Sequence, residues 1–163
     1  MKKTILATAL VLTGVSAYAD TKIAIVNPSQ IFNDANSGSL SVKKLENDLK
    51  PEAVKLQQEQ QDIMQEMQDL QSNSATMTKS VLAEKQQKIQ QEQQSFQEKA
   101  QALQKKEYDR KEELASKFQA SFDSAVNDVA KQKGYNMVVT TQSLAYSNGV
   151  DDITPQVVAL MNK

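Results

Sequence analysis

The side chains of this sequence that could carry out chemistry are carboxylates, lysines and glutamine amides, because histidine and cysteine are both absent. The commonest general base, the thiol nucleophile and the soft metal ligands are therefore missing. With only four glycines, the chain also offers no glycine-rich loop to hold a phosphate group. We expect no metal site, no cofactor and no enzyme; a hydrolase built from carboxylates alone is the remaining enzymatic alternative.

The balance of charge limits the partners that the chain can bind. Its formal net charge is −1 at pH 7, with 19 basic and 20 acidic residues. A protein that binds nucleic acid needs a basic surface to neutralise the phosphates, so we expect no nucleic acid among its ligands. The missing phosphate loop argues in the same way against a nucleotide.

The N-terminal residues 1–19 have the pattern of a signal peptide. Lys2 and Lys3 form a positive segment, an apolar run follows from Ile5 to Val15, and Ala17-Tyr18-Ala19 has small residues at the cleavage positions. The apolar run is shorter than the roughly 20 residues that a transmembrane helix needs. We expect cleavage after Ala19 and a periplasmic protein without a lipid anchor or disulfides, since cysteine is absent.

Apolar residues at a strict spacing of seven mark residues 42–113 as a long helical hairpin. One series precedes a polar break at residues 72–79 and a second follows it, which predicts a left-handed supercoiled seam. Folding the chain antiparallel about residue 76 brings the two series together. The expected partners are Leu70 with Leu82, Ile63 with Ile89, Leu56 with Phe96, and Leu49 with Leu103.

The seam of this hairpin carries about one strong apolar residue per heptad, which is too few for a tightly zipped coiled coil. We therefore expect the two helices to flex and to separate from each other. Pro51 removes a backbone donor from the outgoing helix, so the helix either kinks or stops there. Glutamine is frequent in both helices and indicates a solvated helical face, because it forms helices readily.

Residues 20–41 and 114–163 flank the hairpin and predict a small α+β head. The first part holds a strand at residues 22–27 and a short helix begun by Asn27 and Pro28, after which Ser39 or Ser41 caps the arm. The second part begins with the base of the long returning helix, which ends at Gly134. Strands at residues 136–140 and 144–147 and a terminal helix at 155–162 complete it.

Three short strands make a sheet that is barely stable alone and that leaves open edges. We expect several copies of the chain to pair these edges and to give their arms a common base. The residues that we expect in the head core and in its oligomer contacts are Ile23, Ile25, Phe118, Phe122, Val138, Val139 and Leu144.

The order of these elements resembles the Skp (OmpH) family of periplasmic chaperones over nearly the whole chain. The pieces that carry the resemblance are residues 22–27 (KIAIVN), 96–102 (FQEKAQA), Val138-Val139 with Ala145-Tyr146, and 152–154 (DIT). The resemblance implies a homotrimer whose strands form a small β-barrel head, from which helical hairpins hang like tentacles around a cavity. It also implies an ATP-independent holdase that encloses unfolded outer-membrane proteins and delivers them for insertion into the outer membrane.

The arm contains four candidates for contact with such clients, namely Met64, Met67, Met77 and Phe96. Thioethers are flexible and polarizable, so they adapt to many partners. Packing within the hairpin is the alternative role for these side chains.

The resemblance also implies a lipopolysaccharide-binding cluster on the arm, of which Lys99 and Arg110 keep two positions. Asp109 replaces a basic residue there, and acidic residues offset the neighbouring lysines, so a solvated charged face is the alternative. Two other functions remain open, a periplasmic spacer or adaptor and an envelope protein that binds lipopolysaccharide. An adaptor needs a dense patch at the tip, where residues 72–79 hold only Ala75 and Met77 as apolar residues.

Overall fold

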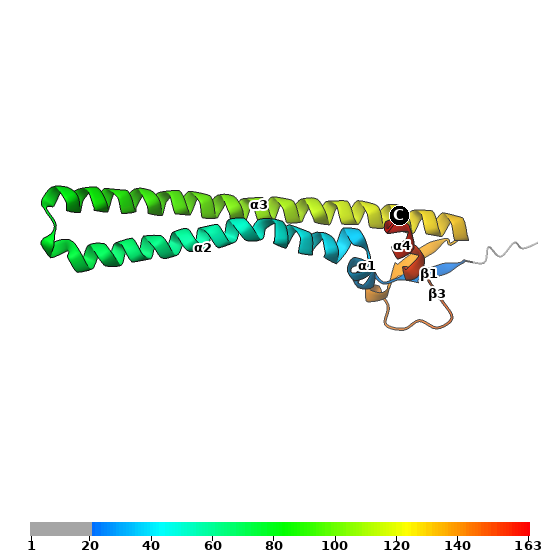
Figure 1. Cartoon of the computed structure of the whole chain (residues 1–163). Helices are drawn as coiled ribbons and strands as arrows, with labels where there is room; N and C mark the ends of the chain where they lie inside the picture. The colour runs from blue at the N-terminus through cyan, green and yellow to red at the C-terminus, as the bar shows by residue number, and fades with distance from the viewer. Residues whose placement is uncertain (1–20) are drawn as a thin grey trace, which may run out of the picture.

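The structure is a computed structural model that describes residues 21–163, so the predicted signal peptide and its cleavage site lie outside the described residues. A long antiparallel helical hairpin extends from a small head (Figure 1). The arm consists of α2 (Ser41–Asn73) and α3 (Lys79–Lys133), joined through a 3-10 turn (Ser74–Thr76). The head contains the base of α3 with β1 (Ile23–Val26), α1 (Pro28–Asp34), a π-helical turn (Asn36–Leu40), β2 (Met137–Thr140), a second 3-10 turn (Thr141–Ser143), β3 (Asp151–Asp152) and α4 (Thr154–Met161).

The sheet of the head is parallel, and β1 lies at its centre. β1 pairs with β2 on one side, where Ile23 is opposite Met137, and with β3 on the other side. Successive side chains of a strand point to opposite faces of the sheet. Ala24 and Val26 therefore point into the core, where they are 0% and 2% exposed, whereas Ile23 points outward and is 40% exposed.

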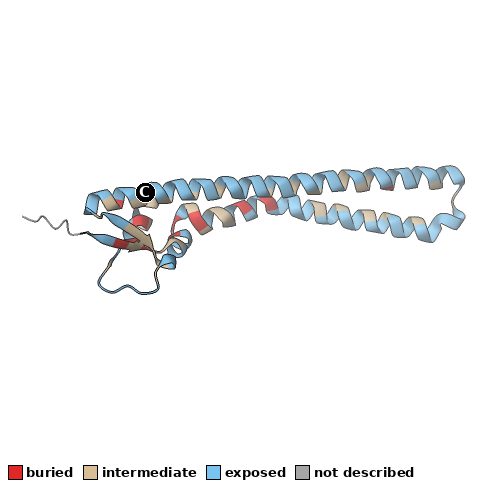
Figure 2. Ribbon diagram, turned by 180° about the vertical axis from the view of Figure 1, so that it is seen from behind, coloured by how far each residue is buried: buried red, intermediate tan, exposed pale blue. Residues whose placement is uncertain are grey.

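The hydrophobic core lies between the inner face of the sheet and the helices α1, α3 and α4. These elements and the residues next to them supply its buried side chains, which are Ala24, Val26, Ile31, Ala35, Ala125, Val129, Ile153 and Val157. Figure 2 shows that most buried residues gather in the head and at the adjoining base of α2. The packing of the head therefore anchors the arm.

The predicted strand at residues 144–147 is not formed, and the third strand of the sheet is β3 instead. A 3-10 turn follows β2 directly and leads the chain away from the sheet. β3 takes the free side of β1, and just beyond it the Ile153 N–H donates to the Ile25 carbonyl at 3.0 Å. The apolar residues that predicted a strand belong to a connecting loop, in which Tyr146 is 81% exposed.

Two helix ends have the caps that the sequence predicts. At the start of α1, Asn27 Oδ1 accepts a hydrogen bond from the Gln30 N–H at 3.1 Å, and Pro28 occupies the first helical turn. At the end of α3, Gly134 adopts the left-handed conformation with φ of 72°. Glycine reaches this conformation without the steric cost that a β-carbon brings. Both cap predictions are confirmed.

The side-chain cap predicted at Ser39 or Ser41 is wrong. α2 starts directly from the preceding turn, and Ser41 Oγ donates to the Asn36 carbonyl at 2.9 Å instead of capping the helix. The chain turns toward α2 at Gly38, whose φ of −92° and ψ of −118° are not helical. A β-carbon on Gly38 would lie 2.0 Å from the Phe32 carbonyl oxygen, so the turn requires glycine.

Pro51 lies inside α2, so the helix continues through this residue and does not stop there. Both views show that α2 is bent (Figures 1 and 2). It comes close to α3 near the middle of the hairpin and diverges from it toward the tip. Of the two alternatives for Pro51, the structure therefore has the continuous, bent helix.

The buried hydroxyl of Thr154 connects the two ends of the head and supplies a test of its packing. Thr154 Oγ1 accepts a hydrogen bond from the Asn27 N–H at 2.9 Å. Thr154→Val keeps the side-chain shape but leaves this N–H without an acceptor, so we expect the free energy of unfolding to fall by about 1–3 kcal/mol. Thr154→Ser keeps the hydroxyl and should lose less. Urea denaturation followed by circular dichroism measures both variants, and a smaller loss for valine than for serine would contradict this role.

Candidate functional site

The two helices of the arm meet in a different register from the one predicted. Leu56 lines a hollow of about 260 Å³ together with Leu103, and Ile63 lines another of about 320 Å³ together with Phe96. Each partner lies one heptad further along α3 than the predicted one. Since the apolar residues of both helices repeat every seven positions, the seam alone fits either register. The predicted pairs Leu56 with Phe96 and Ile63 with Ile89 are therefore wrong.

Charged residues beside the seam distinguish the two registers. Glu52 and Glu59 of α2 form ion pairs with Lys106 and Lys99 of α3, and the second pair is 2.9 Å long. In the predicted register, one heptad back along α3, Glu52 would face Lys99 and Glu59 would face Glu92. The ion pairs are exposed, so each contributes little stability alone. The apolar seam is satisfied equally by both registers; in the observed one Glu52 and Glu59 both face a lysine, whereas in the other Glu59 would face Glu92.

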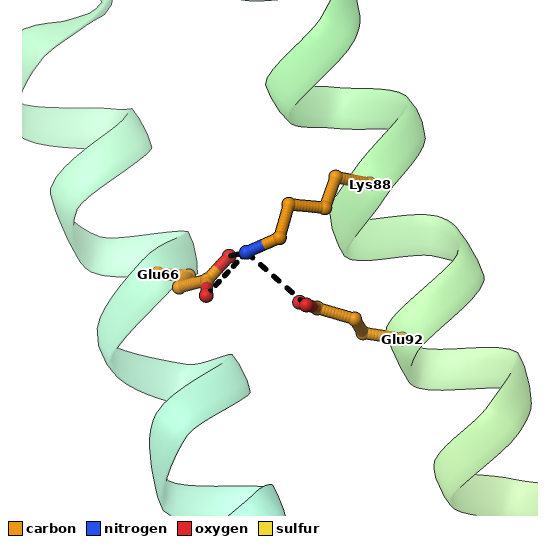
Figure 3. Close-up of polar contacts among 3 residues, drawn as sticks. All are labelled: Glu66, Lys88 and Glu92. Atoms are coloured by element: carbon orange, nitrogen blue, oxygen red, sulfur yellow. Dashed lines mark hydrogen bonds and ion pairs between the residues drawn. The ribbon is translucent and has the colours of Figure 1, made fainter.

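Glu66 continues this series of carboxylates at the same spacing of seven, but its partner breaks the pattern. The corresponding position on α3, seven residues before Lys99, holds Glu92. Lys88 replaces the missing lysine, with its Nζ 2.7 Å from Glu66 Oε1 and 3.1 Å from Glu92 Oε1 (Figure 3). One lysine thus joins a carboxylate of each helix. We call the side of the arm with these interhelical ion pairs the ionic face.

The shared lysine changes the protonation equilibria of this cluster. The hydrogen bond from Lys88 holds the pKa of Glu66 below its usual value. Hydrogen bonds to Glu66 and then to Glu92 raise the pKa of Lys88. Glu92 Oε2 is buried and has no hydrogen-bond partner among the described residues. Lys88 therefore supplies the ion pairs of both carboxylates, and the charge of Lys85 adds a weaker attraction to Glu66.

The other side of the seam carries no charge along the outer half of the arm. Two adjoining hollows, of about 880 and 320 Å³, share Met64, Met67 and Gln93 in their walls. The described residues that line the two hollows are all uncharged: Ile63, Met64, Met67, Leu70, Leu82, Ile89 and Phe96 are apolar, and Gln60, Gln68, Gln71, Ser74, Gln86, Gln90, Gln93 and Gln97 are polar. We call this groove the uncharged face.

The structure brings three of the four client-contact candidates together on the uncharged face. Met64 and Met67 are 64% and 46% exposed, and both line the same hollow as Phe96. Met77 lies half-buried in the connection at the tip, outside the groove. The sequence interpretation missed the glutamines of this face. Their signal is a repeat at seven, in which Gln86 and Gln93 share one helical position and Gln90 and Gln97 share another.

The two residues implied in lipopolysaccharide binding are each engaged by a carboxylate. Lys99 pairs with Glu59 across the arm, and Arg110 lies 3.5 Å from Glu113 on its own helix. The surrounding lysines also have acidic partners, as in the pairs Lys105–Asp109, Lys111–Glu107 and Lys117–Glu113. This part of α3 therefore presents little uncompensated positive charge to an anion.

The head residues singled out from the sequence fall into two groups. Phe118, Phe122 and Val138 pack against the buried core. Ile23, Ile25 and Val139 lie with Met137 on the outer face of the sheet, as the alternation of β1 and its register with β2 require. Leu144 lies half-buried in the loop after β2. In the described chain the outer face therefore leaves Ile23 and Met137 exposed, while Ile25 and Val139 are half-buried.

The acidic residues of the arm do not assemble a metal site. Within residues 21–163, no group of three or more acidic side chains is placed to hold a metal ion. No helix in this part of the chain is long and apolar enough to cross a membrane. The chemistry that the described arm offers consists of ion pairs, amide hydrogen bonds and apolar contacts.

Comparisons with known proteins assign a family and a fold. A family model described as "Outer membrane protein (OmpH-like)" matches residues 22–161. The chain is similar to the chaperone protein Skp of Salmonella typhimurium, at 36% identity, and to that of Yersinia enterocolitica, at 32% identity. Each of these alignments covers 96% of this chain and 97% of the relative.

A solved structure shares the architecture described above. It is the crystal structure of an OmpH-like protein from Caulobacter crescentus, with a TM-score of 0.76 and 16% sequence identity. The match covers 99% of this chain and 89% of that one. At this level of identity the likeness shows the fold, a long helical hairpin on a small sheet.

The cluster of Lys88 with its two carboxylates predicts how pH and charge control the separation of the helices. The lowered pKa of Glu66 means that its ion pair is present at neutral pH and is lost as the pH falls through that pKa. The raised pKa of Lys88 preserves the pair to beyond the usual range of lysine at high pH. We expect acid to widen the distribution of distances between the two helices near the tip in the unmodified chain. We expect Lys88→Met to have the same effect at pH 7.

Spin labels on cysteines introduced at Asp69 and Gln87 report this distance, and the chain has no native cysteine to interfere. Labelled chains are diluted with unlabelled ones so that distances within one arm dominate. Lys85→Met is the matched control, since Lys85 lies on the same helix and acts on Glu66 only through its charge, without an ion pair within the described residues. An equal widening in both variants would mean that Lys88 acts only through overall charge.

Proposed function

The chain belongs to the OmpH-like outer membrane protein family, and from that membership we propose that it is an ATP-independent holdase chaperone of the periplasm. It encloses unfolded outer-membrane proteins between its arms, prevents their aggregation and delivers them for insertion into the outer membrane. The observation that carries this proposal is the similarity to proteins named chaperone protein Skp along 96% of the chain.

The arm supports this function because it uses so little of its apolar surface internally. Between Leu49 and Ala125, Ile89 is the only buried residue of this described stretch. The seam residues and the methionines beside them remain partly exposed and available to a client. Many weak contacts of this kind hold an unfolded chain and still let it exchange, so release needs no nucleotide.

We propose further that the chain reaches the periplasm through a signal peptide cleaved after Ala19. The positive, apolar and small-residue segments of residues 2–19 support this assignment. The mature chain then begins shortly before β1, so that its first ordered element is the central strand of the head.

The head supports a trimer in which strands of several chains form one small barrel. β2 and β3 are the two edges of the described sheet, and each leaves a row of backbone groups unpaired. The outer face adds Ile23 and Met137, which are 40% and 53% exposed. Pairing of edges and covering of this apolar face both favour association of identical chains, and the association gives the arms a common base.

Proteins rather than lipopolysaccharide are the proposed ligands of the arm. The acidic partners of Lys99 and Arg110 leave little free charge for a phosphorylated lipid. The polar character of the tip, residues 72–79, gives no support to a dedicated adaptor.

The holdase function predicts suppression of aggregation when a denatured outer-membrane β-barrel protein is diluted into buffer with the purified mature chain. We expect light scattering to fall with increasing chain concentration and to be unaffected by ATP. The same quantity of folded bovine serum albumin serves as a control for unspecific protection. Scattering that does not respond to a molar excess of the chain would refute the proposed function.

The trimeric head predicts that a charge on the outer sheet face dissociates the oligomer. Ile23→Lys places an ammonium group among apolar side chains of neighbouring chains, where desolvation is costly. We expect sedimentation to shift from trimer to monomer at micromolar concentration, with helical circular dichroism retained because Ile23 is 40% exposed in the single chain. Ile23→Val should remain trimeric. An unmodified chain that sediments as a monomer would contradict the assembly.

A further inference from the structure

We propose that the uncharged face of the arm is a docking groove for a short, extended and uncharged strand whose side chains alternate between apolar and polar. This inference deepens the proposed function, on which it rests, by naming the segment of an unfolded client that binds one arm. The groove lies between α2 and α3 of a single chain, in the part of the arm nearest the tip.

The distribution of charge defines the occupant. None of the described side chains that line the groove carries a charge, although lysines and carboxylates line the hollows on the ionic face of the same helices. A charged side chain that entered the groove would lose water without gaining a counter-charge. The groove therefore selects against charged segments, and it accepts apolar side chains against Met67, Leu70 and Ile89.

The glutamines of the groove favour an extended strand over a helix. A helix satisfies its own backbone hydrogen bonds, whereas an isolated strand presents unpaired N–H and C=O groups along its length. Each glutamine amide offers both a donor and an acceptor to such groups. With amides at the rim and apolar side chains beneath, the groove matches a strand whose side chains alternate with a period of two.

One of these amides already occupies a place that a strand could take. Gln93 Nε2 donates across the seam to Met67 Sδ at 3.1 Å. A thioether sulfur is a weak acceptor, so a backbone carbonyl of an incoming strand is a better partner for the same N–H. The Gln93 N–H is thus held inside the groove by a weak hydrogen bond. A ligand carbonyl that accepted from this N–H would form a stronger one.

The ionic face lets the groove open without dissociating the helices. Glu66 and Glu59 are held to α3 by Lys88 and Lys99 on the far side of the seam. The two helices can therefore separate on the uncharged face while these ion pairs act as the hinge. From Met64 to Ser74 the wall of α2 extends about 15 Å at 1.5 Å per residue. That length matches about five residues of strand.

The experiment uses the full mature chain, labelled with 13C at the methionine methyl groups, and a synthetic peptide of alternating Thr and Val with one Trp. The chain contains no tryptophan, so peptide fluorescence measures binding without background. We expect the methyl signals of Met64 and Met67 to shift on binding. Met137 and Met161 lie in the head and should not shift. A peptide with Lys and Glu in place of Thr should bind more weakly.

Matched charge variants locate the site. Gln90 lines the groove, whereas Gln87 is exposed on the same helix and lines neither of its hollows. We expect Gln90→Glu and Gln90→Lys each to weaken peptide binding by about fivefold or more, because either charge must lose water when the strand docks. Gln87→Glu and Gln87→Lys should bind as the unmodified chain does. If only one of the two Gln90 variants lost peptide binding, the site would respond to the sign of the charge, and the proposal would be overturned.

The failure of this inference is distinguishable from failure of the holdase function. Suppressed scattering together with no peptide binding, or with peptide binding that leaves Met64 and Met67 unshifted, would overturn the groove alone. Equal binding of a peptide with the same composition but all its Val residues in one block would also overturn it. Scattering that the chain does not suppress would refute both proposals.

Discussion

The scarcity of apolar residues between α2 and α3 is the constraint on which the rest of the structure depends. Among the described residues between Leu49 and Ala125 only Ile89 is buried, so the helices cannot hold each other through a continuous hydrophobic seam. Two consequences follow from this. The orientation of the arm is set by the head, where α3 packs with α1, α4 and the sheet. Within the arm, ion pairs between α2 and α3 supplement the few apolar contacts of the seam.

The same constraint explains how an arm can serve unfolded proteins. A seam that is not closed leaves apolar surface beside solvated amides. The helices diverge toward the tip (Figure 1), and the hollow of about 880 Å³ lies in this part of the arm. The division into an ionic and an uncharged face separates two tasks. Exposed ion pairs hold the helices together only weakly, so the arm can still flex, and the uncharged face is the proposed site of contact with client chains.

The elements of the fold could be predicted well where local chemistry decides them. The helix ends at Asn27, Pro28 and Gly134 depend only on the backbone next to each residue. Their roles therefore follow from residue type. The prediction of a strand at residues 144–147 was wrong because strand pairing is a long-range contact. β3 pairs with the free edge of β1 instead. The predicted register was wrong for a related reason: a repeat of seven is unchanged by a shift of seven, so the apolar residues alone leave the register ambiguous, and Glu52 would face a lysine in either register. Phe96 was singled out from the sequence as a candidate for client contact, but its neighbours on the uncharged face depend on that register.

The central position of β1 has a consequence for the order in which the protein folds. This strand stands at the beginning of the described chain, yet both of its neighbours, β2 and β3, come more than a hundred residues later. The arm between them contains mostly local contacts and can form quickly, whereas the sheet requires closure of a very long loop. A chain that emerges through a membrane from its N-terminus therefore completes its arm before its sheet. The proposed assembly with other copies then has to wait until the last residues have emerged, which would tie the start of function to the end of synthesis and of the proposed export.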